Sequence, residues 1–240
     1  LFRSIVRESL GAGGAAARPR VPAHGLGPAF IDPALAFLSS RGGEVRFGAR
    51  LRGLQFSDDR VTALDFGEAA IALGTDDAIV FAAPAWSALE LIPGVHAPSE
   101  HCAIFNAHFA VPPPAGMPLL TGVVGGMSEW VFAFPDRLSV TISAADDFID
   151  SAPDDVGLRI WREVAAIAGI DAANIPPMRI VKEKRATFAA TPAQDALRPQ
   201  PQTRWRNLLL AGDWTQTGLP ATIEGAIRSG ERAAELAARL

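Results

Sequence analysis

Residues 207–234 read NLLLAGDWTQTGLPATIEGAIRSGERAA and carry the strongest structural signal in the chain. The apolar run Leu208–Ala211 predicts a short buried strand. Gly212 lets the backbone approach another group closely, and Asp213 places a carboxylate at the carboxyl end of that strand. Beyond a loop, Pro220 suits the first turn of a helix, because its φ is already helical and it has no N–H group to satisfy.

A helix after Pro220 is predicted by small and apolar residues at helical spacing, namely Ile223, Ile227, Gly230, Ala234 and Ala237. A strand, an acidic turn and a helix N-terminus directed at one point form a suitable site for an electron-rich ligand atom. On spacing alone, the same pattern is equally consistent with a plain α/β scaffold.

With its full set of residue types, the stretch resembles the C-terminal flavin motif of the flavin-containing amine oxidase and phytoene desaturase superfamily. The run Ala-Gly-Asp-Trp-Thr-Gln-Thr-Gly-Leu-Pro-Ala-Thr-Ile-Glu-Gly-Ala at 211–226 is most similar to the squalene-associated FAD-dependent desaturases, the hydroxysqualene dehydroxylases. The resemblance implies that Asp213 bonds the ribityl–pyrophosphate part of FAD and that the helix N-terminus faces the isoalloxazine. The cofactor-binding positions implied here are Gly212, Asp213, Gly218, Pro220, Ala221, Thr222 and Ile223. Trp214 and Thr217 are the candidates for facing the isoalloxazine and the substrate, although Trp214 is equally typical of core packing.

The first hundred residues predict a helix at 33–40, strand-forming segments from Glu44 to Phe66, and a buried strand at 78–83 that ends at Pro84. The resemblance places Leu51 near the adenine of FAD, and Ala83 and Pro84 near its phosphates. Because 78–83 and 208–211 are both short apolar runs ended by Pro or Gly, we expect them in one sheet. Their return to one sheet would make the residues between them an insertion.

That insertion has its own pattern of strands and one long helix. Strands are predicted at 104–110, 122–124, 130–134, 139–143 and 179–188, and a helix at 153–168. The predicted fold class is therefore α/β, or mixed α+β, with a partial FAD-binding Rossmann-like domain and a mixed β-sheet substrate domain. The predicted boundaries are 1–95 and 196–240 for the first domain and 96–195 for the second.

The string Gly11-Ala-Gly-Gly-Ala-Ala16 matches the dinucleotide pattern G-x-G-x-x-G/A only in letters. A helix-like segment precedes it and prolines follow it, so we interpret it as a flexible turn. Since the sequence also begins with Leu, we expect it to be part of a longer protein and to lack the N-terminal segment that binds FAD pyrophosphate.

Composition excludes several other classes. The net charge of −4 gives no electrostatic basis for nucleic-acid binding, and the single cysteine, Cys102, fits a reducing cytoplasmic compartment. The four histidines are not spaced as metal ligands, so no metal site is predicted. No apolar run reaches the ~18 residues that span a bilayer.

The resemblance implies a FAD-dependent oxidoreductase that removes the hydroxyl group of a C30 isoprenoid alcohol and forms squalene for hopanoid synthesis. The alternatives are a carotenoid-type desaturase, a flavin amine oxidase, and, in a different class, an inactive fragment with a structural or interaction role. An apolar isoprenoid substrate partitions into the bilayer, so we expect peripheral contact with the inner membrane, for which the basic, amphipathic segment 1–10 is a candidate.

Overall fold

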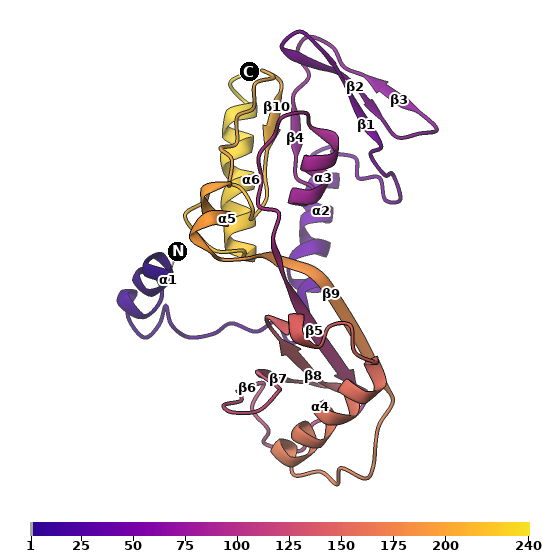
Figure 1. Cartoon of the computed structure of the whole chain (residues 1–240), viewed down its shortest axis with the longest axis vertical. Coiled ribbons are helices and arrows are strands. Elements are labelled where there is room, and N and C mark those ends of the chain that lie inside the picture. Colours follow the sequence, from indigo (N-terminus) through magenta and orange to yellow (C-terminus); the bar gives the residue numbers. More distant parts are fainter. Residues whose placement is uncertain (1) are drawn as a thin grey trace. The chain divides into compact units, whose positions relative to one another are not determined.

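The computed structural model describes residues 2–240, so Leu1 of the predicted N-terminal helix lies outside the described residues. The chain divides into two compact units, one made of the residues up to 18 with 46–100 and 188–240, the other of 19–45 and 101–187 (Figure 1). The sequence-based boundaries differ from this division by a few residues at each crossing, and they also placed 19–45 in the first unit.

The centre of the first unit is a pair of parallel strands, β4 (Ile79–Phe81) and β10 (Leu208–Leu210), with Leu209 opposite Val80. The prediction that these two distant runs share one sheet is therefore confirmed. Leu208 and Leu210 face a cluster that includes α3 (Ala85–Leu91), whereas Leu209 faces α6 (Ile223–Ala237). In Figure 1 the two helices lie on opposite sides of the strand pair.

Asn207 joins this core to the antiparallel meander β1 (Gly53–Ser57), β2 (Arg60–Asp65) and β3 (Ala70–Ala72). Its buried amide accepts from the Val61 N–H at 2.9 Å and donates to the Val61 carbonyl at 2.9 Å, as a neighbouring strand would. Its own carbonyl accepts from the Ile79 N–H at 2.8 Å. One side chain therefore satisfies the backbone of β2 at the start of the parallel pair.

The predicted strand signal from Glu44 to Leu51 is wrong, because the segment up to Arg52 is not a strand and the meander begins at Gly53. Gly48 has a φ of 73°, which breaks an extended conformation, and the Phe47 side chain is 80% exposed. Alternating apolar residues form a strand only when a partner strand and a core lie beside them. In the described chain residues 44–51 have no partner strand, and of their apolar side chains Leu51 packs against a core cluster.

The second unit contains a five-stranded sheet in the order β6-β7-β8-β5-β9. Its strands are β5 (His101–Phe109), β6 (Leu120–Gly122), β7 (Trp130–Phe134), β8 (Arg137–Ile142) and β9 (Met178–Phe188). One face packs on α4 (Pro153–Ala168), through Phe105, Phe109 and Val140 of the sheet and Ile160 and Trp161 of the helix. The predictions of β7 and α4 are confirmed to the residue, and the other strands within a few residues.

The remaining elements are short. They are α1 (Phe2–Glu8), the 3-10 turns η1 (Leu10–Ala12) and η3 (Ala145–Asp147), the π-helical turn η2 (Gly27–Ile31), α2 (Asp32–Ser40) and α5 (Pro192–Ala196). Gly11 to Ala16 follow a helix and form turns, so the interpretation that this glycine run is no dinucleotide fingerprint is confirmed.

Candidate cofactor site

The turn after β10 is built around the indole of Trp214. Gly212 has a φ of 140°, and a Cβ atom there would lie 2.4 Å from Trp214 Nε1. The indole is buried and donates through Nε1 to the carbonyl of Ala83 at 3.0 Å. The close approach that the sequence assigned to Gly212 is therefore made, but by Trp214, and the indole joins the turn to the end of β4.

Asp213 lies half-buried beside this indole, and its carboxylate accepts backbone hydrogen bonds from its own N–H and that of Trp214. Burial raises the pKa of Asp213 above its ordinary value, and the two N–H groups and the nearby Arg198 oppose that rise only in part. The carboxylate is thus incompletely solvated by the protein, and its energy is lowered by a ligand that supplies a further donor.

Arg198 binds the turn at three residues, Asp213, Thr215 and Thr217. It was not among the site residues predicted from the sequence. Its fully buried guanidinium donates to the carbonyls of Thr215 at 2.9 Å and Asp213 at 3.0 Å, and to Thr217 Oγ1 at 2.7 Å. Its third nitrogen pairs with Asp195 at 3.0 Å. The only available signal was the Arg-Pro dipeptide at 198–199, which carries no indication of a contact fifteen or more residues downstream.

The helix α6 begins at Ile223, so the prediction that Pro220 occupies its first turn is wrong. Thr222 is the N-cap instead, and its Oγ1 accepts from the Gly225 N–H at 3.0 Å. The N–H groups of Ile223 and Glu224, which come before Gly225, have no partner inside the helix and are directed at the space in front of it.

The residues of α6 that face the sheet are not the apolar ones whose spacing predicted the helix. Gly225, Ser229 and Ala233 are buried, whereas Ile223 and Ile227 are 52% and 44% exposed. Small residues are needed because the helix lies close to β10, and Ser229 Oγ accepts from the Gly212 N–H at 2.7 Å. The helix is thereby fixed to the Gly212 turn.

A second part of the candidate site lies at the carboxyl end of β4. A cavity of about 220 Å³ is lined there by Leu51, Ala83, Arg50, Arg52 and residues of α3. Two of the predicted cofactor residues, Leu51 and Ala83, therefore border one cavity, and Pro84 is the N-cap of α3 beside it.

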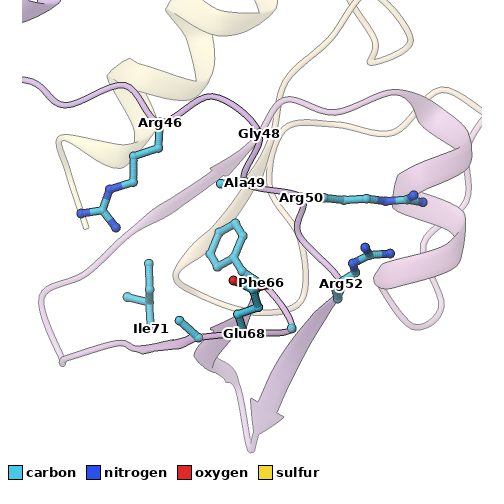
Figure 2. Close-up of a pocket in the computed structure, with 10 residues that line it drawn as sticks. Arg46, Gly48, Ala49, Arg50, Arg52, Phe66, Glu68 and Ile71 are labelled. Carbon is cyan, nitrogen blue, oxygen red and sulfur yellow. The ribbon is translucent and has the colours of Figure 1, made fainter.

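An adjoining hollow of about 580 Å³ lies between residues 46–52 and residues 66–71, which form the turn before β3 and its first residues. Figure 2 shows the side chains that line it. The side chains of Arg50 and Arg52 extend in the same direction, away from Arg46. Both arginines border the hollow and the cavity, so two guanidinium groups offer donors to an anionic ligand at this end of the sheet.

The structure thus brings Gly212, Asp213, Trp214 and Thr217 together in one turn, to which α6 is bonded through Ser229. The sequence matches the model of the family described as flavin containing amine oxidoreductase over residues 13–238. The chain belongs to this family. The cofactor prediction, FAD, agrees with that flavin-containing family.

Curated relatives agree with the family assignment. The chain is 57% identical to a hydroxysqualene dehydroxylase of Rhodopseudomonas palustris, over 98% of this chain and 56% of the relative. It is 52% identical to a hydroxysqualene dehydroxylase of Sinorhizobium fredii, over 99% of this chain and 57% of the relative. The chain therefore spans a little over half the length of the curated relatives it matches.

Among solved structures, a putrescine oxidase variant superposes with a TM-score of 0.63 at 14% identity, covering 88% of this chain and 53% of that one. At this identity the likeness establishes the fold alone, and it agrees with the predicted class of mixed α/β flavoprotein fold.

The residues present fit FAD chemically. The half-buried Asp213 carboxylate has capacity for ligand hydroxyl donors, and the N-terminus of α6 offers N–H groups to electron-rich atoms. Arg50 and Arg52 provide the positive charge that a pyrophosphate requires.

Proposed function

We propose that the full-length protein to which this chain belongs is an FAD-dependent oxidoreductase that converts a hydroxylated C30 isoprenoid into squalene. The observation that carries the proposal is the 57% identity, over 98% of the chain, to a hydroxysqualene dehydroxylase. When bound and reduced, the flavin would supply the hydride that forms the new C–H bond, and the hydroxyl group would take up a proton and leave as water.

Within this proposal the first unit holds the cofactor and the second holds the substrate. Asp213 accepts from ribityl hydroxyl groups, and the start of α6 at Thr222 and Ile223 faces the ring system. Trp214 supports the turn through its bond to Ala83, and Thr217, held by Arg198, faces the reacting centre. Leu51, Ala83 and Pro84 lie along the adenosine and phosphate parts.

An N-terminal segment of the full-length protein completes the cofactor site in this account. The support is twofold: the chain spans 56% of its relative, and residues 11–16 form turns after a helix where a pyrophosphate loop requires a strand before it and a helix after it. Flavin absorbance that co-purified stoichiometrically with the 240-residue chain alone would contradict this part of the proposal.

Contact with a membrane surface follows from the apolar substrate. No helix within residues 2–240 is both long and apolar enough to cross a bilayer. The helix α1 carries Arg3 and Arg7 with a 44% exposed Ile5, a composition that suits the surface of an anionic bilayer. Co-sedimentation of the full-length protein with phosphatidylglycerol vesicles, lost in an Arg3→Glu/Arg7→Glu variant, is the expected result.

The function is tested by product analysis. The full-length flavoprotein is reduced anaerobically and incubated separately with hydroxysqualene, phytoene and a simple aliphatic amine. Squalene formed from the first alone is the expected result, whereas turnover of the amine with neither isoprenoid reacting would overturn the proposal.

A further inference from the structure

The sheet of the second unit has a second face, opposite α4, whose composition is set by its register. Residues directly opposite one another in antiparallel strands share a face. One row across this face contains Trp130, Thr141 and Asn106, and the next contains Leu120, Phe132, Ser139 and His108. These residues lie on strands that are adjacent in the sheet, so the two rows form one continuous surface.

The β6–β7 side of this face is apolar and aromatic. Phe132 and Phe134 are stacked with their ring centroids 6.0 Å apart, and Leu120 lies opposite Phe132. Trp130 is 46% exposed. Aromatic and aliphatic surface of this kind suits a long hydrocarbon chain, which gains free energy from removal of its area from water.

The β8–β5 side of the same face is polar. His108 Nδ1 and Ser139 Oγ lie 2.9 Å apart, and Thr141 Oγ1 donates to Asn106 Oδ1 at 2.8 Å. Each pair joins the two strands, so the four side chains form a short polar stripe next to the aromatic rings. Such a stripe costs free energy on an otherwise apolar face unless its hydrogen-bonding groups are used.

The two hydrogen bonds leave specific donors unused within the described chain. Thr141 donates to Asn106 Oδ1, so the Asn106 Nδ2 group keeps its two hydrogens for another partner. Ser139 is 4% exposed, and among the described residues its hydroxyl group has a hydrogen-bond partner in His108, so its hydrogen is satisfied when it donates to Nδ1. In that tautomer Nε2 of His108 carries the proton and is a donor.

The charge state of His108 agrees with this arrangement. Burial lowers the pKa of His108 below its ordinary value, and the cations Arg137 on β8 and Arg179 on β9 lower it further. The ring is therefore neutral at pH 7, where it donates from one nitrogen only.

We propose that His108 and Asn106 recognise the hydroxyl group of an otherwise apolar ligand whose chain lies on the neighbouring Phe132 and Trp130. The inference rests on the proposed function, since it assigns to this face the selection of the alcohol over the hydrocarbon that the reaction forms. Two neighbouring donors that bind a ligand hydroxyl would distinguish these ligands, because only the alcohol can satisfy them.

The test compares binding of hydroxysqualene and squalene to the oxidised, full-length holoenzyme, by co-sedimentation of labelled ligand from detergent micelles. The measured quantity is the preference ratio, Kd for squalene divided by Kd for hydroxysqualene. His108→Leu and Asn106→Leu should each lower this ratio about fivefold, as expected for loss of one hydrogen bond. His108→Gln, which retains a donor, should restore part of it.

The matched control is Phe132→Leu, which should weaken the binding of both ligands and leave the ratio of their Kd values unchanged. Thermal melting identifies any variant that does not fold, and either polar variant alone suffices for the comparison. A lowered ratio in a folded polar variant but not in Phe132→Leu supports the inference. An unchanged ratio in the polar variants, or an equal fall in Phe132→Leu, overturns it.

The two proposals fail separately. A protein that shows the ratio shift but forms no squalene when reduced retains this inference and loses the proposed function. A protein that forms squalene without any ratio shift does the reverse.

Discussion

Replacing Arg198 by methionine should disrupt the turn that carries Asp213 while leaving the aliphatic volume of the side chain in place. The buried guanidinium donates to the Thr215 and Asp213 carbonyls and to Thr217 Oγ1 at 2.7–3.0 Å. The Thr215 carbonyl also accepts from the Thr217 N–H, and Thr217 Oγ1 from the Leu219 N–H, so within the described residues the Asp213 carbonyl depends on Arg198 most. Leaving a buried acceptor unsatisfied costs about 1–3 kcal/mol. The Asp195 pair adds little, because that carboxylate side chain is 38% exposed.

The expected loss for Arg198→Met is therefore about 1–3 kcal/mol in the free energy of unfolding, the cost of leaving the Asp213 carbonyl without its donor. The assay is equilibrium denaturation in urea of the full-length apoprotein, together with the Kd for FAD from flavin fluorescence. Arg204→Met is the matched control, since the exposed Arg204 guanidinium lies 4.2 Å from the Trp205 ring and such a contact is worth about 0.5–1 kcal/mol. Equal losses in the two variants would refute the reasoning.

Three further outcomes follow from the same structure. Asp213→Ala should weaken FAD binding to the full-length protein by about 1.5–3 kcal/mol, the value of a hydrogen bond to a charged acceptor, as measured by fluorescence titration; an unchanged Kd would contradict the assigned role. Gly212→Ala should lower the thermal midpoint because its Cβ would lie 2.4 Å from Trp214 Nε1, whereas Gly230→Ala, with no atom within 4 Å, should not; equal midpoints would count against the packing argument. Burial would raise the pKa of Glu163, but the hydrogen bonds from the Met127 and Ser128 N–H groups outweigh burial and hold that pKa below 4.5. The ionised Glu163 therefore stabilises the fold above pH 4.5, and this stabilisation is lost as the pH falls through the lower pKa of the folded state. Glu163→Gln should reduce the fall in the free energy of unfolding below pH 4.5, as measured by urea denaturation at a series of pH values. An unchanged fall would exclude Glu163 as its source.

Local patterns predicted the elements whose own sequence is sufficient to define them. The apolar face of the helix 153–168 is visible in the sequence, and the structure ends this helix at Gly169 in the left-handed conformation. The pairing of β4 with β10 was also predictable, because two fully apolar runs of three residues need a buried sheet.

Features that depend on distant partners were not predictable. Arg198 became part of the site only because the fold brings it under a turn fifteen residues away, and no local pattern indicates this. The buried face of α6 could not be predicted from apolar residues. The helix packs closely on β10 through the small residues Gly225, Ser229 and Ala233, and its isoleucines are exposed. The segment up to Arg52 alternates like a strand, but it has no partner strand in the described chain and therefore does not form one.

The central claim is that the turn from Gly212 to Ile223 holds the flavin, and an experimental structure of the full-length holoenzyme with FAD tests it most directly. The account predicts a ribityl hydroxyl within hydrogen-bonding distance, about 3 Å, of the Asp213 carboxylate. It also predicts that the isoalloxazine lies in front of the first turn of α6. A flavin bound elsewhere, with Asp213 facing solvent or protein alone, would contradict it.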